Sequence, residues 1–342
     1  MYGLVQIQES IFRSQARSYI RLLSGAIGCN HRQYSQRLER IITDFACERS
    51  FAKAVASIQE HYGFSIPMSS ASKITYKHTQ RIANEQEKHV KTAMAVPPCG
   101  VDKLIAQADG SMVAIVQNSG KNKDRRKNRQ IDYREARLCA CRAQGKSQTH
   151  YTASFEDAQK TGLLWALCAK HAGRGMHTKV HVVCDGALWI ANQAQNYLKP
   201  HRQLLDFYHV CEYLNEAKPQ TLPSKRGPGW MNTQKRRLQN NRYDLVLEEL
   251  GKRVESNDID DEQAPVRRAF RYLKNRTDQL DYQGAMADNL PIGSGMIESA
   301  HKQVIQSRLK IAGASWSIHN AQSMVQTRAI RESGYWATCW KN

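Results

Sequence analysis

The stretch that decides the fold is residues 179–197, which read KVHVVCDGALWIANQAQNY. Its first six residues are rich in β-branched Val and predict a buried strand over 179–184. Asp185 and Gly186 follow as a turn, and the spacing of the apolar residues over 187–197 predicts a helix. A strand, a tight turn and a helix in this order indicate an α/β domain, in which helices cover the faces of a sheet.

The segments around this stretch extend the same plan. A helical pattern over 157–171 precedes it, and another helix is predicted over 210–217. Further β-rich runs that predict strands are 103–116, 134–142 and 150–155. Strands that first follow one another and then alternate with helices predict a mixed sheet with helices on its faces.

The chain is predicted to contain four segments. The residues from 9 to 96 have a helical pattern that stops at Pro97-Pro98, and strand signals become rare after residue 217. The predicted segments are an α-helical N-terminal module (1–96), the first part of the α/β core (97–217), a helical insertion (218–289) and the closing helices of the core (290–342). Helices outside the first core segment are predicted over 238–254, 264–281, 296–310 and 317–332.

Composition restricts the class of protein. The 342 residues include 50 Lys and Arg against 31 Asp and Glu, a net charge of +19 that favours a polyanionic partner. No apolar run approaches the roughly 18 residues of a membrane span, and the polar start has no signal-peptide pattern. We therefore expect a cytoplasmic, nucleoid-associated protein and no membrane partner. The nine cysteines are scattered without a CxxC pair, which indicates reduced thiols.

The N-terminal module contains a possible helix-turn-helix. A helix over 49–62 is ended by Gly63, a turn contains Pro67, and a second helix is predicted over 69–90 with Ser69 or Ser70 as its N-cap. An ordinary packed helical hairpin would have the same pattern. The basic, hydroxyl-rich second helix favours DNA binding. Its candidate contacts are Ser70, Lys73, Lys77 and Arg81.

Three carboxylates are candidate metal ligands. Asp109 and Asp185 each follow an apolar run and precede a glycine, although each pair alone is more typical of a plain turn. Glu298 follows the Gly- and Ser-rich loop 292–295 and lies near the start of a helix. Two aspartates on neighbouring strand ends and a glutamate on a later helix can bind two divalent ions roughly 3.5 to 4 Å apart. Their hard oxygen ligands select Mg²⁺ or Mn²⁺.

Four sequence blocks extend this pattern. They read ADGSM (108–112), DGALWI (185–190), LDFYHVCEYL (205–214) and LPIGSGMIES (290–299). In their order and spacing they resemble the blocks of bacterial insertion-sequence DDE transposases of the Kra type, which belong with the Mutator-like group. The resemblance spans nearly the whole chain, because residues 28–63 are similar to the helical region that those proteins carry ahead of the catalytic domain.

The resemblance implies an RNase H-like fold with a helical insertion between the second Asp and the Glu. It implies that Asp109, Asp185 and Glu298 are the catalytic metal ligands, for Mg²⁺ or Mn²⁺. It adds Asp206 and His209 as an Asp-x-x-His pair beside the site, at the end of the strand that follows Asp185. The alternative is that Asp206 only caps a helix and that His209 is buried against Tyr208 or Trp189.

Two basic groups are weaker candidates for DNA contact. The run 121–129 joins two predicted strands, and phosphate contact there competes with a plain solvated loop; its candidates are Lys121, Arg125 and Arg126. The start of the insertion is basic around Trp230, which can stack on bases or anchor a core. Its candidates are Lys225, Arg226, Lys235, Arg236 and Arg237.

The function predicted from the sequence is that of a DNA transposase. It would bind double-stranded DNA at the terminal inverted repeats of its element, hydrolyse a phosphodiester bond at each end and join the 3′-hydroxyl to target DNA. The alternatives are a nuclease or resolvase of the same fold that does not join strands, and a DNA-binding repressor derived from a transposase. All three acids are present, which argues against a repressor. Joining two ends requires two active sites, so a homodimer or higher multimer is expected on DNA.

Overall fold

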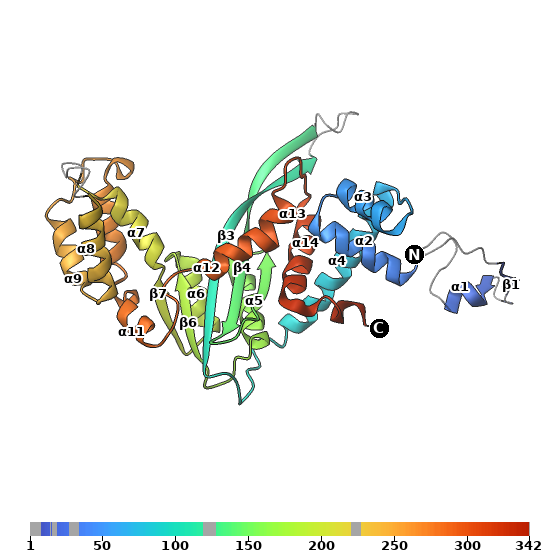
Figure 1. Ribbon diagram of the computed structural model, residues 1–342, viewed down its shortest axis with the longest axis horizontal. Helices are drawn as coiled ribbons and strands as arrows, with labels where there is room; N and C mark the ends of the chain where they lie inside the picture. Colours follow the sequence, from blue (N-terminus) through green and yellow to red (C-terminus); the bar gives the residue numbers. More distant parts are fainter. Residues whose placement is uncertain are drawn as a thin grey trace. The chain divides into compact units, whose positions relative to one another are not determined.

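The computed structural model describes residues 8–13, 15, 19–26, 34–118, 128–219 and 227–341. It confirms the predicted mixed α/β architecture, with a five-stranded sheet in the order β5-β4-β3-β6-β7 (Figure 1). The strands are β3 (Lys103–Asn118), β4 (Arg129–Ala143), β5 (His150–Ser154), β6 (Lys179–Cys184) and β7 (His201–Leu205). Strand β7 has mixed polarity and was not among the β-rich runs.

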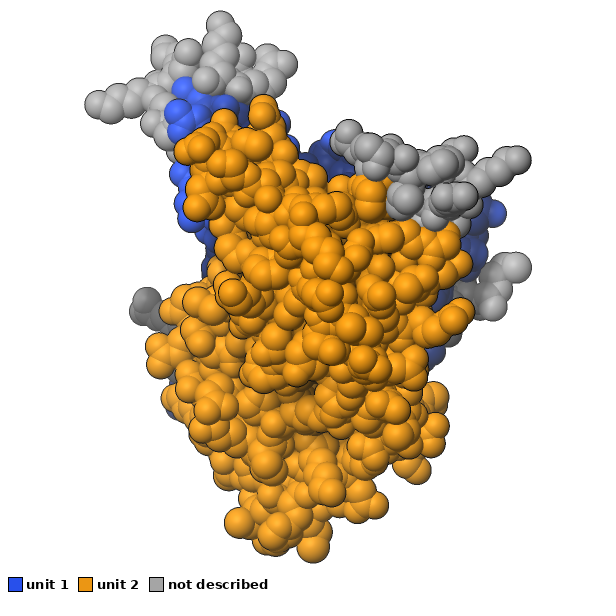
Figure 2. Space-filling model, turned by 90° about the vertical axis from the view of Figure 1, so that its left-hand side faces the viewer, with its two compact units in different colours: residues 1–88, 112–134, 302–342 blue, residues 89–111, 135–301 orange. Residues whose placement is uncertain are grey.

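The chain forms two compact units, coloured separately in Figure 2. The first contains residues 1–88, 112–134 and 302–342, and the second contains residues 89–111 and 135–301. Residues 112–118 of β3 and 129–134 of β4 belong to the first unit. The parallel part of the sheet belongs wholly to the second.

In the second unit, the pairing register assigns the side chains of the sheet to two faces. Strand β3 runs parallel to β6, and β6 runs parallel to β7, whereas β4 and β5 are antiparallel. Leu104, Val182 and Cys184 share one face, because side chains alternate along each strand. On that face they form a core with Trp165 of α5 and Ile190 of α6. The opposite face buries Val183 among side chains from α7 and the helices that follow it.

The helices of this unit are α5 (Ala158–His171), α6 (Leu188–Tyr197), α7 (Phe207–Glu216), α8 (Gly227–Gln239), α9 (Tyr243–Gly251), α10 (Pro265–Lys274), α11 (Tyr282–Ala287) and α12 (Gly295–Ala300). The single helix predicted over 238–254 is wrong, because Asn241 adopts a left-handed backbone with φ 54° and separates α8 from α9. The helix predicted over 264–281 likewise ends at Lys274. Helices α7 to α11 share one apolar core, which includes Leu238, Val246 and Leu273.

The first unit contains α2 (Gln36–Glu48), α3 (Phe51–Tyr62) and most of α4 (Met68–Val90), packed around Ile42, Ile58 and Ile74. Gly63 ends α3 with φ 74°, as predicted. Helix α4 begins one residue earlier than predicted. The carbonyl of Pro67 accepts from the amides of Ser70 and Ala71, so neither Ser69 nor Ser70 is the N-cap.

The first residues of the described chain are not helical, in contrast to the prediction. Strands β1 (Ile11–Arg13) and β2 (Tyr19–Arg21) form an antiparallel pair in which Phe12 lies opposite Ile20. Aromatic and β-branched residues favour such pairing over a helix. A short helix, α1 (Leu22–Ala26), follows directly.

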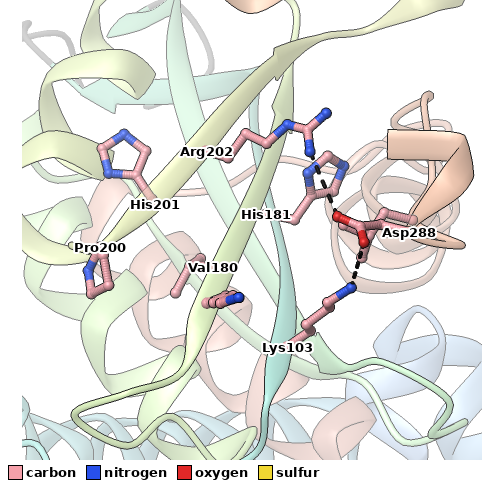
Figure 3. Close-up of a pocket in the computed structure, with 9 residues that line it drawn as sticks. Lys103, Val180, His181, Pro200, His201, Arg202 and Asp288 are labelled. Carbon is pink, nitrogen blue, oxygen red and sulfur yellow. Dashed lines mark hydrogen bonds and ion pairs between the residues drawn. The ribbon is translucent and has the colours of Figure 1, made fainter. Parts of the chain in front are cut away.

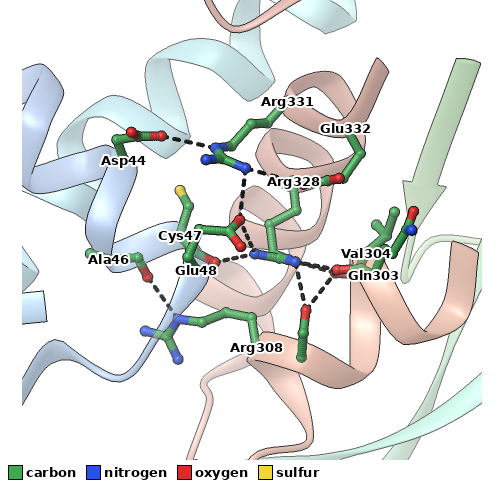
Figure 4. A network of polar contacts seen from close by, with 11 residues as sticks. Asp44, Ala46, Cys47, Glu48, Gln303, Val304, Arg308, Arg328, Arg331 and Glu332 are labelled. Carbon is green, nitrogen blue, oxygen red and sulfur yellow. Dashed lines mark hydrogen bonds and ion pairs between the residues drawn. The ribbon is translucent and has the colours of Figure 1, made fainter. Parts of the chain in front are cut away.

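Two buried arginines join the C-terminal helices α13 (Ser307–Leu309) and α14 (Ile318–Ile330) to the end of α2 (Figure 4). Arg328 is 1% exposed, donates to the carbonyls of Cys47 and Val304 and pairs with Glu48 at 2.8 Å. Arg308 donates to the Ala46 carbonyl at 2.7 Å. These contacts satisfy carbonyls that the end of a helix leaves open. Part of the positive charge of the chain is therefore structural and is not available to DNA.

None of the helices in the described parts of the chain has the length and apolarity needed to cross a membrane.

Candidate active site

Three strands of the second unit bring aspartates to the same level of the sheet. Gln107 of β3 pairs with Val183 of β6, and Asp109 and Asp185 each lie two residues further along. Cys184, the last residue of β6, pairs with Leu205, the last residue of β7. Asp185 and Asp206 directly follow these two residues. The carboxyl ends of neighbouring parallel strands meet at one edge, so the three carboxylates lie together.

The prediction of a turn at Asp109-Gly110 is wrong. Strand β3 continues through both residues to Asn118, although its parallel pairing with β6 ends before them. Glu135 lies against Gly110: a Cβ at this position would be 2.1 Å from the Glu135 carboxylate oxygen Oε1, so that side chain would have to move. The glycine therefore permits close approach within the sheet and does not reverse the chain.

A cavity of about 220 Å³ opens at this edge and contains the predicted site. Its walls bring together all three predicted metal ligands and both predicted auxiliary residues. The lining residues are Ala108, Asp109, Cys184, Asp185, Asp206, Tyr208, His209, Glu212, Ser294, Ile297 and Glu298.

The loop that carries Glu298 is held to the sheet by Gln107. This side chain is 1% exposed. Its amide nitrogen donates to the Gly293 carbonyl at 3.0 Å, and its oxygen accepts from the Ile297 amide at 2.9 Å. Gln107 lies two residues before Asp109, so one strand positions two of the three carboxylates. The sequence analysis did not identify this residue; a polar amide inside the apolar run of β3 was the available signal.

Asp206 is a structural link between β7, α7 and the same loop. Its Oδ1 accepts from the amides of Tyr208 and His209 at 2.6 and 3.2 Å, and its Oδ2 accepts from the Ser294 amide at 2.8 Å. This is the helix cap that the sequence left as an alternative. Both carboxylate oxygens are engaged by backbone donors, so Asp206 shapes the cavity wall.

His209 lies on the wall of the cavity and is not buried against Tyr208 or Trp189, as the same alternative supposed. Its side chain is 38% exposed, and its Nδ1 lies 3.1 Å from Oε2 of Glu212. The ring packs edge-on against Tyr213 and Tyr272, with centroids 5.5 and 6.1 Å away. The imidazole is therefore oriented by an acid and two aromatic rings.

The turn after β6 is held from the side of α10. The hydroxyl of Tyr272 donates to the Asp185 carbonyl at 2.6 Å, and Arg276 Nη2 donates to the Gly186 carbonyl at 3.1 Å. Gly186 has φ 82°, in the left-handed region that favours glycine. Oδ1 of Asp185 accepts from the Ala187 amide at 2.9 Å, which opens α6. Together these contacts fix the direction of the second carboxylate.

Asp109 has a buried histidine as its neighbour. His301, which is 5% exposed, begins a π-helical turn directly after α12. Its Nε2 lies 3.1 Å from Asp109 Oδ2, without the alignment of a hydrogen bond, and neither ring nitrogen has another partner within the described residues. The other oxygen of Asp109 accepts from the Gly110 amide at 2.7 Å. The spacing Glu298-x-x-His301 on one helix face is the signal that could have identified this histidine.

The donor set suits a hard divalent cation. Among the described residues, no Lys or Arg forms an ion pair with Asp109, Asp185 or Glu298, and the carboxylate of Glu298 contacts only the Ser294 hydroxyl, at 3.4 Å. Oxygen ligands of this kind bind Mg²⁺ and Mn²⁺. In the described chain no three metal-ligating side chains already converge on one point.

A family model matches the chain from residue 3 to residue 340, which includes every residue of this cavity. The chain belongs to the uncharacterised protein family UPF0236. No curated protein matches the sequence.

A second cavity of the UPF0236 chain, of about 210 Å³, lies at the opposite ends of the same strands (Figure 3). There the acid is paired with cations. Asp288 lies 2.9 Å from Lys103 Nζ and 3.7 Å from Arg202, and Arg202 also pairs with Asp281 at 2.7 Å. Lys103 holds the pKa of Asp288 below its usual range. His181 Nε2 donates to the Pro291 carbonyl, 2.8 Å away, on the loop that leads to Glu298.

The predicted DNA contacts in the N-terminal module of this UPF0236 chain differ in their exposure and in their partners. On α4, Lys73 is exposed and Ser70 is half-buried. Lys77 pairs with Glu39 at 3.0 Å, and Arg81 donates to the Cys339 carbonyl at 2.7 Å.

The basic residues of the insertion also differ from one another. On α8, Arg236 is exposed, Lys235 is half-buried and Arg237 donates to Gln234 Oε1 at 3.1 Å. The remaining candidates lie outside the described residues: Lys121, Arg125, Arg126, Lys225 and Arg226.

Proposed function

We propose that this UPF0236 chain is a DNA transposase whose active site is the carboxylate cavity. One observation carries the proposal: Asp109, Asp185 and Glu298, from β3, the end of β6 and α12, line a single cavity, and no Lys or Arg among the described residues pairs with them. Clusters of unneutralised carboxylates are costly, and they are typical of sites that bind metal ions. The four sequence blocks that resemble DDE transposases supply the reaction type.

The proposal includes two finer structural assignments. The mixed sheet with α5 and α6 on one face and α7 and α12 on the other would be an RNase H-like core. Helices α3 and α4, joined by the turn from Gly63 to Pro67, would be a helix-turn-helix that reads the element ends. Lys73, Lys77 and Arg81 of α4 are all exposed, and Lys77 and Arg81 also have partners within the chain.

The chemistry follows from the donor set. Asp109, Asp185 and Glu298 would hold Mg²⁺ or Mn²⁺, which when bound acidifies the attacking water and stabilises the leaving oxygen. In hydrolysis, the water oxygen bonds to phosphorus, the bond from phosphorus to the 3′-oxygen breaks, and that oxygen takes a proton to become a 3′-hydroxyl. In joining, this hydroxyl attacks a target phosphorus and displaces the target 3′-oxygen.

The protein's own contribution is to position the acids. Gln107 and Asp206 hold the loop that carries Glu298, and Tyr272 and Arg276 hold the turn of Asp185. Placement of reacting groups within a fraction of an ångström contributes as much to catalysis as the chemistry of the groups. The partners would be double-stranded DNA of the element ends and target, with a homodimer or larger multimer forming on DNA.

The test is an assay of the purified full chain with a plasmid that carries the inverted repeats flanking its reading frame. We expect nicked and joined products with Mg²⁺ or Mn²⁺ and none in excess chelator. Asp185→Asn is the matched control, because it keeps the fold and the basic surface but removes one ligand. Cleavage without joined products would assign the nuclease alternative. Binding without any cleavage would assign the repressor alternative, and full cleavage in chelator would exclude the metal mechanism.

A further inference from the structure

Helix α10 borders a third cavity, of about 280 Å³, that the predicted function does not use. It is lined by Tyr213, Arg268, Arg271, Tyr272, Asn275 and Arg276. Three guanidinium groups, one amide and two phenol rings thus face the same space, and no carboxylate of the described residues lines it. Such a wall offers hydrogen-bond donors and positive charge, which suits an anion with several oxygens.

Five of these residues form one stripe, which we call the α10 stripe: Arg268, Arg271 and Tyr272 of α10, its C-cap Asn275, and Arg276 directly after it. The spacings of three and four residues among the first four place them on a single face of the helix. From Arg268 to Asn275 the stripe extends over about 10 Å at the rise of an α-helix. A nucleic-acid strand advances about 3.4 Å per phosphate, so the stripe matches a run of about three nucleotides.

The stripe leads to the carboxylate cavity. At its C-terminal end Arg276 holds the Gly186 carbonyl, and Tyr272 holds the carbonyl of Asp185. Tyr213 and Tyr272 stack with centroids 4.2 Å apart, and the ring of His209 packs edge-on against both. His209 lines the carboxylate cavity and contacts two residues that line the third cavity.

Arg268 and Arg271 can exchange their carboxylate partners for a phosphate. Arg271 pairs with Asp261 at 2.5 Å and Arg268 with Glu216 at 2.8 Å, and in both pairs the side chains are exposed by a third or more. Exposed pairs of this kind contribute little to stability. A phosphate can accept two parallel hydrogen bonds from a guanidinium fork and can replace or share the carboxylate.

We propose that the α10 stripe binds the phosphate backbone of one DNA strand, over about three nucleotides, where that strand leaves the carboxylate cavity. The proposal rests on the proposed function and adds a site to it. Since Arg276 and Tyr272 also hold the turn of Asp185, a strand on the stripe lies on the element that positions a catalytic carboxylate. The helical insertion thereby contributes to the placement of the scissile bond.

The experiment measures binding of a short fluorescein-labelled DNA duplex by anisotropy, over a series of salt concentrations and without divalent ions. Arg268→Ala combined with Arg271→Ala should weaken binding about 30-fold at about 0.15 M salt, since each lost phosphate contact costs about fivefold there. The slope of log affinity against log salt should fall by about two. Arg271→Lys keeps the charge but not the fork, and we expect an intermediate loss.

Lys252→Ala is the matched control. Lys252 is an exposed cation of the insertion that is also paired with an acid, Glu248 at 3.0 Å, but it does not line the cavity. The DNA affinity of the Lys252→Ala variant should stay within about twofold of wild type. Thermal unfolding checks that each variant is folded.

The outcomes separate this proposal from the proposed function. Wild-type binding and cleavage with an unchanged salt slope in the arginine variants would overturn the α10 stripe alone. An equal loss of DNA affinity for Lys252→Ala would also overturn it, because the effect would then come from the overall positive charge of the chain and not from the α10 stripe. Absence of DNA binding and cleavage by the wild-type chain would overturn the proposed function itself.

Discussion

The two ends of the parallel strands each place an aspartate and a histidine at a cavity, in different surroundings. At the carboxyl ends, Asp109 and Asp185 share a cavity of about 220 Å³ with no Lys or Arg of the described chain paired to them. At the amino ends, a cavity of about 210 Å³ contains Asp288, which Lys103 and Arg202 neutralise. The residue types alone do not separate the two. The pairing does, because a neutralised acid needs no ligand and an unpaired cluster can bind a cation.

The histidines show the same contrast. His181, at the amino ends, is fixed by the Pro291 carbonyl, and burial lowers its pKa. His301, at the carboxyl ends, is similarly buried, and among the described residues its one polar neighbour is the Asp109 carboxylate. His181 therefore holds the loop at Pro291, whereas His301 lies against Asp109, a candidate metal ligand.

The largest effect is expected from removing the carboxylates at the active end. Asp109→Asn, Asp185→Asn or Glu298→Gln should each lower cleavage by about three orders of magnitude, because a ligand worth several kcal/mol at the transition state is lost. Binding to DNA should change less than about twofold, since the basic surface remains. Single-turnover cleavage and anisotropy measure the two. Wild-type cleavage by any variant would remove that residue from the site.

Gln107→Leu should have the next largest effect. The Gly293 carbonyl would lose its buried donor, at a cost of about 1 to 3 kcal/mol, while the Ile297 amide keeps the Ser294 carbonyl. Misplacement of Glu298 should lower cleavage about 100-fold. Urea unfolding and cleavage kinetics test both effects.

The matched control for Gln107→Leu is Gln203→Leu, on the neighbouring strand β7. Gln203 bonds to the side chains of Cys184 and Gln279 and does not contact the loop. Equal losses of cleavage in the two variants would show that a glutamine on either strand matters only for stability.

His301→Ala should have a smaller effect, of about tenfold. Groups that contact a metal ligand without binding the metal typically change metal affinity or activity by about 10- to 100-fold. We therefore expect a higher Mg²⁺ concentration for half-maximal cleavage, with the maximal rate largely retained. His301→Gln should restore part of the loss. At the other end, His181→Gln should leave the Mg²⁺ dependence unchanged, and an equal shift there would contradict the contrast between the two ends.

The smallest effect is expected for Asp288→Asn. Its pKa lies below the ordinary 3.8 because of Lys103, so the carboxylate stabilises the fold above that pH and the contribution is lost as the pH falls through the lowered value. The melting temperature of the variant should therefore be lower than that of wild type at neutral pH and converge with it in acid. Cleavage at neutral pH should stay within about twofold. Thermal unfolding at a series of pH values measures this.

Local patterns predicted most of the sheet and its covering helices. The Val-rich run of β6 and the helix of α6 were evident because burial on both faces leaves an unbroken apolar strand. Composition did not indicate β7, which only the resemblance implied, because its residues Arg202 and Gln203 are polar and interact with side chains distant in sequence. The break at Asn241 was missed because a left-handed residue leaves little trace in apolar spacing.

By itself, the sequence determined the α/β class and the acids on which the proposed site depends, because strand composition and Asp-Gly or Gly-Ser-Gly signals are local. Only the tertiary structure decided which charges are neutralised. Asp206 is committed to capping α7, Asp288 is paired by cations from two strands, and Asp109 is left beside His301. These partners are brought together by strand register and helix packing, and a pattern of neighbouring residues along the chain does not contain that information.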